Sequence, residues 1–250
     1  RSTPSNSSAA SDVYKRQIPS TYMQLPESRI EGYRNFANKL WNASRFVLMN
    51  LEDFEKDPER PLKQILCDKW ILSRFNTVVK DVTDCLERFR FADAAQAVYD
   101  FLWHEYCDWY IELIKPRLYY SDDEDAKYTA QYIASEILEG TLRLLHPFMP
   151  FITEEIWQNM PHQGETIVLA DWLQYNPQQV DEESVKAMNL VMDLIDGIRS
   201  IRGEMNVPPS SEINILVQVP NEHNRVILEE HLEDYLKALS KIDEISIAEN

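Results

Sequence analysis

Glycine is scarce in this chain of 250 residues, which contains only five. Loops that cradle phosphates need several glycines at fixed spacing, and neither a Walker A pattern nor a GxGxxG fingerprint occurs. A nucleotide-binding loop is therefore not supported. Long apolar runs are also missing, since none approaches the roughly 18 residues needed to cross a bilayer. We expect no membrane partner.

Cysteine and histidine are few and scattered. The three cysteines, Cys67, Cys85 and Cys107, are odd in number and far apart, so they suggest neither a disulfide framework nor a zinc site. The five histidines show no HExxH or other metal-ligand spacing, and no GxSxG motif occurs. We expect no metal ligand and no catalytic residue, and a reducing cytoplasm fits this cysteine usage best.

Positive charge is in short supply. The chain has 25 Lys and Arg against 42 Asp and Glu, a formal net charge of -17. Proteins that coat nucleic acid through its phosphates need a basic surface, so generic DNA or RNA coating is excluded. An acidic protein can still bind RNA through a local basic and aromatic patch that reads exposed bases.

The apolar residues recur at three- and four-residue steps, which predicts a bundle of antiparallel helices. Residues 1–17 are rich in Ser and lack this period, so we expect a disordered or non-native leader. The bundle is expected over 18–160, with the third helix stopped by Pro116. The expected helices are about Glu27–Leu51, Leu62–Phe89, Asp93–Ile114, Ser121–Leu145 and Thr153–Met160.

A second unit is expected over 161–250. It begins with a helix at about Glu182–Glu204, which Pro208 and Pro209 terminate. Alternating apolar residues in Ile213–Val219 and Ile242–Ile247 then predict two half-buried strands, with a helix between them. The predicted fold class is mainly α: an antiparallel helix bundle followed by a small α/β unit.

One face of the first helix combines basic, amide and aromatic side chains. Its members fall within a sector of about 100° opposite the apolar stripe; they are Arg34, Asn38, Trp41, Asn42, Arg45 and Met49. Lys69, Trp70 and Arg74 would extend this surface if the first two helices were antiparallel neighbours. Such a surface suits unstacked bases, but an aromatic residue at helical spacing more often serves packing, so Trp41 and Trp70 can also be packing residues.

These segments resemble the anticodon-binding domain of valyl-tRNA synthetases. The most specific stretch is GYRNFANKLWNASRFVL at 32–48, followed by DKWILSRFN at 68–76 and WHEYCDWYIELIKPRLY at 103–119. HPFMPFITEEIW at 146–157 and IRSIRGEMNVPP at 198–209 agree as well. The resemblance covers about residue 27 to the C-terminus and implies a helix bundle of the class I synthetase type.

The resemblance implies a parent enzyme that joins valine to its tRNA with ATP and Mg²⁺. The HIGH-like and KMSKS-like motifs of the catalytic domain do not occur here, so we expect a non-catalytic fragment without a cofactor, and a monomer. Relatives typically continue into a C-terminal coiled coil beyond the position of Asn250. By resemblance, Arg45, Lys69 and Trp70 would contact anticodon bases or phosphates, with Asn38, Asn42 and Arg74 as second choices.

Two functions therefore remain open. The chain is either an RNA-binding module for the valine anticodon loop, or a helical module that docks on a catalytic domain or another protein and binds no RNA alone. The strong acidity favours the second hypothesis, and the basic and aromatic helix face favours the first.

Overall fold

The computed structural model describes residues 27–208, 211–219, 221–240 and 242–248. The expected leader at 1–17 and the helix terminator Pro209 lie outside these residues. Within the described residues, no helix is both long and apolar enough to span a membrane.

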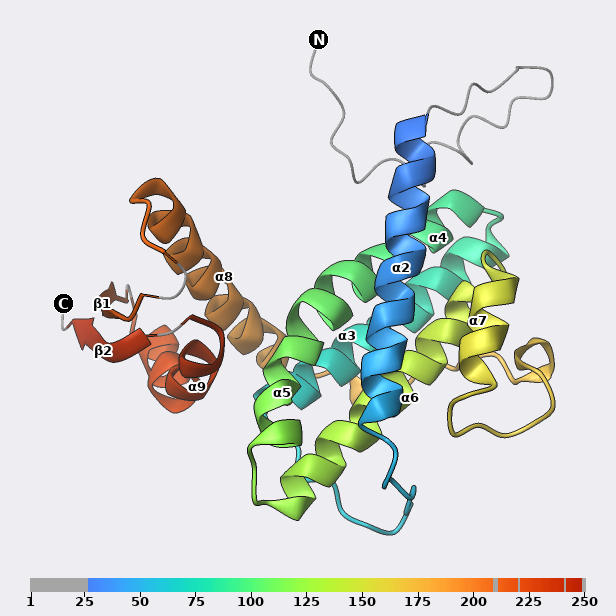
Figure 1. Cartoon of the computed structure of the whole chain (residues 1–250), viewed down its shortest axis with the longest axis horizontal. Coiled ribbons are helices and arrows are strands. Elements are labelled where there is room, and N and C mark those ends of the chain that lie inside the picture. The colour runs from blue at the N-terminus through green and yellow to red at the C-terminus, as the bar shows by residue number, and fades with distance from the viewer. Residues whose placement is uncertain (1–26, 209–210, 220, 241, 249–250) are drawn as a thin grey trace.

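The chain forms a helical bundle followed by a smaller α/β unit (Figure 1). The bundle elements are α2 (Glu27–Met49), α3 (Leu66–Glu87), α4 (Phe91–Asp100), the π-helix η2 (Phe101–Tyr110), α5 (Ile111–Tyr119), α6 (Glu124–Leu145) and α7 (Pro150–Trp157). Two short 3-10 helices follow, η3 (Ile167–Leu169) and η4 (Pro177–Gln179), and then α8 (Glu182–Glu204), β1 (Ile213–Gln218), α9 (Glu222–Ser240) and β2 (Ile242–Ala248). The predicted mainly α fold class is confirmed.

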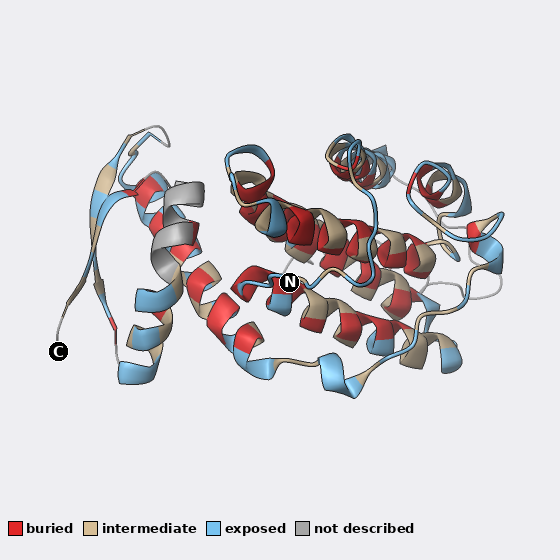
Figure 2. Ribbon diagram, turned by 90° about the horizontal axis from the view of Figure 1, so that it is seen from below, coloured by how far each residue is buried: buried red, intermediate tan, exposed pale blue. Residues whose placement is uncertain are grey.

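Helix α3 lies inside the bundle, whereas α2 lies on its outer side. α3 packs against α4, η2, α6 and α8, and α2 packs against η2, α6 and α7. Figure 2 shows the buried positions of the helices turned toward one another. The expectation that α2 and α3 form one continuous outer surface is therefore wrong, because most of the circumference of α3 is covered by other helices.

The third helix continues through Pro116, where the sequence predicted its end. α4, η2 and α5 follow one another without a break, and Pro116 lies inside α5. Proline inside a helix removes one hydrogen bond and costs about 3 kcal/mol. Burial of Ile114, Arg117 and Leu118 around it holds the helical path, so tertiary packing overrides the local signal.

The C-terminal unit has the predicted strand–helix–strand order. β1 and β2 are parallel, with Ile215 opposite Ile245, and α9 connects them. α8 and α9 pack together, and α9 also packs against α5. The backbone N–H of Cys67 at the start of α3 donates to Tyr235 Oη of α9 over 3.1 Å, which joins this unit to the bundle.

Candidate nucleic-acid interface

The outward side of α2 carries the predicted basic and aromatic residues. Phe36, Leu40 and Val47 point into the core, which turns the opposite side of the helix to solvent. We call the exposed set the α2 face: Arg34, Asn38, Trp41, Asn42, Arg45 and Met49, all of them exposed. The predicted outward orientation of this face is confirmed.

Trp41 is the unusual member of the α2 face because 48 % of it is exposed. Tryptophan is mostly buried in folded proteins, since its large apolar surface is stabilised by removal from water. A half-exposed indole ring provides a flat surface on which a base can stack. Asn38 and Asn42 add amide donors and acceptors beside it.

Arg45 is a free cation in a chain where most cations are paired. Among the residues that the structure describes, Lys and Arg side chains typically meet a carboxylate, as Arg74 meets Glu105 and Arg60 meets Asp125. Among the Lys and Arg side chains whose placement is described, those with neither an ion pair nor a hydrogen bond are Arg45, Lys69, Arg88 and Lys127. Arg45 is therefore available for a phosphate or a base edge without first breaking an internal contact.

Trp70 does not contribute to this surface. Only 1 % of it is exposed, and its indole nitrogen has no hydrogen-bond partner among the described residues. The prediction that Trp70 stacks on an anticodon base is wrong, because the central position of α3 places this ring in the core.

Arg74 and Lys69 lie apart from the α2 face for different reasons. Arg74 forms two hydrogen bonds of 2.7 and 2.8 Å with the carboxylate of Glu105 on η2, and this contact raises the pKa of the guanidinium. Lys69 is exposed, but it lies near Asp181 at the start of α8. The pKa of Asp181 is lowered mainly by hydrogen bonds from Ser184, and the charge of Lys69 adds to this effect.

Two tyrosines at the end of α5 were missed by the sequence prediction. Tyr119 and Tyr120 are 55 % and 85 % exposed, with ring centroids 6.3 Å apart. The Tyr119 ring lies 6.2 Å from that of Phe46 on α2, and Asn50 Nδ2 donates to Tyr119 Oη over 3.3 Å. This α5 tyrosine pair therefore lies beside the last two turns of α2, where Arg45 and Met49 are exposed.

A buried ion pair fixes the end of α5. Arg117 donates from both terminal nitrogens to the Asp68 carboxylate, each over 2.7 Å, and Tyr110 Oη donates to Asp68 over 2.9 Å. Burial alone would lower the pKa of Arg117, but its hydrogen bonds to Asp68 reverse this and raise it. Because Arg117 precedes the α5 tyrosine pair by only two residues, this contact anchors the backbone that carries the rings.

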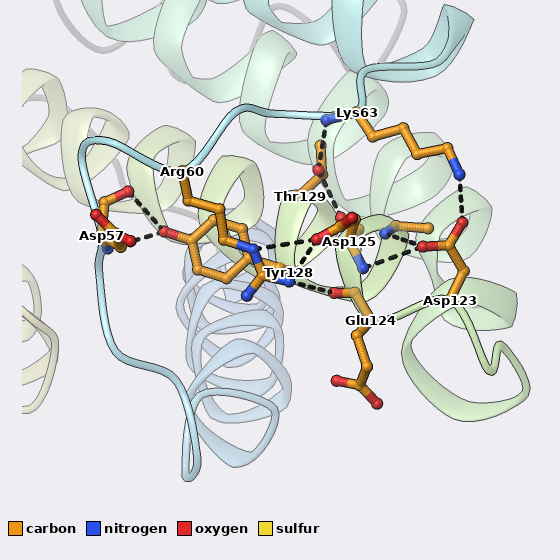
Figure 3. Close-up of polar contacts among 9 residues, drawn as sticks. Asp57, Arg60, Lys63, Asp123, Glu124, Asp125, Tyr128 and Thr129 are labelled. Atoms are coloured by element: carbon orange, nitrogen blue, oxygen red, sulfur yellow. Dashed lines mark hydrogen bonds and ion pairs between the residues drawn. The ribbon is translucent and has the colours of Figure 1, made fainter.

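Ion pairs and hydrogen bonds attach the connection from α2 to α3 to the start of α6 (Figure 3). Arg60 binds Asp125 at 2.6 Å and covers the Tyr128 ring at 4.2 Å, and Lys63 pairs with Asp123. The backbone N–H of Asp57 donates to Tyr128 Oη over 2.8 Å. These contacts hold the chain that leaves α2. Together with the ion pair between Lys56 and Glu136, they occupy the cations of this connection.

A metal site is not apparent in the part of the chain that the structure describes. No group of three or more His, Cys, Asp or Glu side chains converges there in a way that could hold an ion. The chemistry that the α2 face offers is stacking, hydrogen bonding and a single unpaired guanidinium.

Comparison with known proteins identifies the family. Residues 68–217 match the model of the anticodon-binding domain of tRNA ligase. The valine–tRNA ligase of Geobacter sulfurreducens is 46 % identical over 231 residues, which cover 91 % of this chain and 26 % of that protein. The valine–tRNA ligase of Thermotoga maritima is 42 % identical over 90 % of this chain and 24 % of that protein.

One solved structure is similar at lower identity. It is a LeuRS of Agrobacterium radiobacter K84 in a ternary complex with tRNA and LeuAMS, with a TM-score of 0.48 and 20 % identity over 70 % of this chain and 20 % of that chain. The chain spans about a quarter of the length of the curated relatives that it matches. On the match over 68–217, the chain belongs to the family of anticodon-binding domains of tRNA ligases.

Proposed function

We propose that this chain recognises the anticodon loop of valine tRNA, as the anticodon-binding part of a valine–tRNA ligase. The observation that carries the proposal is the α2 face, where a half-exposed Trp41 and an unpaired Arg45 lie one helical turn apart. The names of the relatives support valine as the amino acid.

The residues of the interface have distinct roles in this proposal. Trp41 and Tyr120 supply flat rings on which splayed bases stack, and Arg45 bonds a base edge or a phosphate. Asn38 and Asn42 bond base edges from the same helix. Lys69 is a candidate for a phosphate contact outside this cluster, because its side chain is exposed and has no ion pair within hydrogen-bonding distance, although Asp181 lies near it.

Recognition is proposed to occur without catalysis by this chain. In a full-length ligase, ATP and Mg²⁺ would serve the catalytic part, and this chain would contribute binding alone. We further propose that the chain acts in the cytoplasm and is monomeric, which sedimentation over a range of concentrations would test.

The test is a titration with two RNA stem-loops, one carrying the valine anticodon and one with that anticodon replaced. We expect micromolar or weaker binding to the first stem-loop, because a net charge of -17 opposes association with RNA. We also expect weaker binding at higher salt and weaker binding of the second stem-loop. Equal affinity for the two RNAs would reject anticodon recognition.

A further inference from the structure

A second exposed aromatic cluster lies at the turn between α3 and α4. Phe89 is 80 % exposed and Phe91 is 44 % exposed, and their rings meet edge to face with centroids 6.1 Å apart. We call Arg88, Phe89 and Phe91 the turn patch. Nothing in the proposed recognition of RNA uses it.

Phe89 has a left-handed backbone conformation, which is unfavourable for a phenylalanine. The N–H of Arg90 bonds the Cys85 carbonyl at 2.8 Å and the N–H of Phe89 bonds the Leu86 carbonyl at 3.0 Å, which is the Schellman pattern that ends a helix. Phe89 has φ 58° at the left-handed position of this motif, where glycine is preferred because it has no Cβ. A strained, solvent-exposed phenylalanine suggests a binding role.

The charges around the turn patch favour a protein partner over RNA. Arg90 pairs with Asp93, and Lys80 pairs with Asp84, so these cations are occupied. Arg88 has no ion pair, but the exposed Glu87 lies next to it in sequence. With little net positive charge, two adjacent phenyl rings fit an apolar pocket better than a phosphate backbone.

The length of the relatives indicates which protein covers the turn patch. The turn between α3 and α4 lies on the other side of the bundle from the end of α5 and its tyrosine pair (Figure 1). The relatives are about four times as long as this chain, so a large further polypeptide accompanies this domain in them.

We propose that the turn patch docks into an apolar pocket, with a carboxylate at its edge facing Arg88, on the remaining part of the ligase. This inference rests on the proposed function, because it takes the chain to be one part of a longer ligase. Docking explains why phenylalanine occupies a position that favours glycine: the buried rings stabilise the assembled enzyme, while the isolated domain carries the strain.

The experiment compares this chain with the full-length ligase that contains it, using hydroxyl-radical footprinting with detection by mass spectrometry. We expect oxidation of Phe89 and Phe91 to fall at least about fivefold in the full-length enzyme, as expected for rings removed from water. Equal oxidation of both phenylalanines in the two proteins would overturn the proposal. Protection of Phe89 in this chain by an added stem-loop would also overturn it, because the turn patch would then bind RNA.

The Phe89→Gly variant should change the Tm in opposite directions in this chain and in the full-length ligase. In this chain the Tm should stay the same or rise by roughly 2–4 °C, because glycine relieves the left-handed strain. In the full-length ligase the Tm should fall, because a docking contact is lost. A fall in both proteins, or a rise in both, overturns the proposal, and Leu216→Ala at an exposed position of β1 is the matched control.

RNA recognition by the α2 face and docking by the turn patch can be rejected independently. If neither Trp41 nor Tyr120 is protected by the valine stem-loop, RNA recognition by the α2 face is wrong, whatever happens at Phe89. A concentration-dependent dimer of this chain that Phe89→Gly dissociates would instead assign the turn patch to a second copy and overturn docking on the ligase.

Discussion

Helices α2 and α3 carry the same local pattern and use it differently. Each has a tryptophan followed four residues later by an arginine: Trp41 and Arg45 on α2, and Trp70 and Arg74 on α3. On α2 the ring is half exposed and the guanidinium is unpaired, whereas on α3 the ring is buried and the guanidinium binds Glu105. The difference arises from position, because α3 is surrounded by helices and α2 is not.

The charge of a single surface can differ greatly from the net charge of this acidic chain. Intramolecular ion pairs occupy many of its cations, including Lys56, Arg60 and Lys63 of the connection from α2 to α3. Net charge therefore says little about any one surface. The relevant quantity for recognition of bases is the local supply of unpaired cations and exposed rings, and the α2 face has both.

The largest expected effect is on stability, from Trp70→Ala. Removal of this fully buried ring should lower the free energy of unfolding by about 3–5 kcal/mol, through lost burial and a residual cavity. Urea unfolding followed by circular dichroism measures it. Trp41→Ala is the matched control and should lower the free energy of unfolding clearly less, by about 1 kcal/mol, because half of this ring is already in water. Similar losses for the two variants would remove the contrast between the helices.

The next effect is on binding, from Trp41→Ala. Loss of a stacking surface should weaken binding of the valine stem-loop by about 1–3 kcal/mol, with secondary structure unchanged. Fluorescence anisotropy of a labelled stem-loop measures it, with Met49→Ala on the same face as a comparison. Wild-type affinity in Trp41→Ala would show that this ring does not contact RNA.

Arg45→Ala and Arg74→Ala should differ in which property they change. Arg45→Ala should weaken RNA binding by about 1.4 kcal/mol, or tenfold, and leave stability unchanged. Arg74→Ala should leave binding unchanged and reduce stability by up to about 1 kcal/mol, because its ion pair with Glu105 is partly exposed. Titration and urea unfolding of both variants provide the check, and weaker binding by Arg74→Ala would place α3 in the interface.

The smallest effect concerns pH and the N-cap of α8. Hydrogen bonds from Ser184, with the charge of Lys69, hold the pKa of Asp181 below its usual 3.8. A carboxylate whose pKa is lowered by folding stabilises the fold at every pH above its pKa in the unfolded chain. This contribution is lost as the pH falls through its pKa in the folded chain. At pH 7 the free energy of unfolding of the parent chain should exceed that of Asp181→Asn by about 0.3–1 kcal/mol. In strong acid the two free energies should be equal. A difference that persists there would assign the effect to packing.

Periodicity predicted most of the fold, because each helix keeps one apolar side and its boundary residues are informative. Asp123, for example, caps α6 by accepting from the N–H groups of Asp125 and Ala126, as the acidic cluster before that helix suggested. The continuation through Pro116 was not predicted, because it depends on the burial of Arg117 against Asp68 on another helix. A contact between residues so far apart in the sequence cannot be predicted from the local sequence.

The same limit applied to the interface. The α2 face was predicted from spacing, since an amphipathic helix on the outside of a bundle has one solvent side. The burial of Trp70 was not, because spacing cannot tell an inner helix from an outer one. The α5 tyrosine pair was not predicted, because the helix was expected to end before Pro116. The two adjacent aromatic residues at the end of KPRLYY were the available signal.

Photo-crosslinking tests the central claim most directly. A valine stem-loop with 4-thiouridine in its anticodon would be irradiated with this chain, and the attached tryptic peptides would be identified by mass spectrometry. Recognition by the α2 face predicts crosslinks in the peptide 40–45, which contains Trp41, or in the peptide 118–127, which contains the α5 tyrosine pair. Crosslinks confined to α3 or to the C-terminal unit would contradict it.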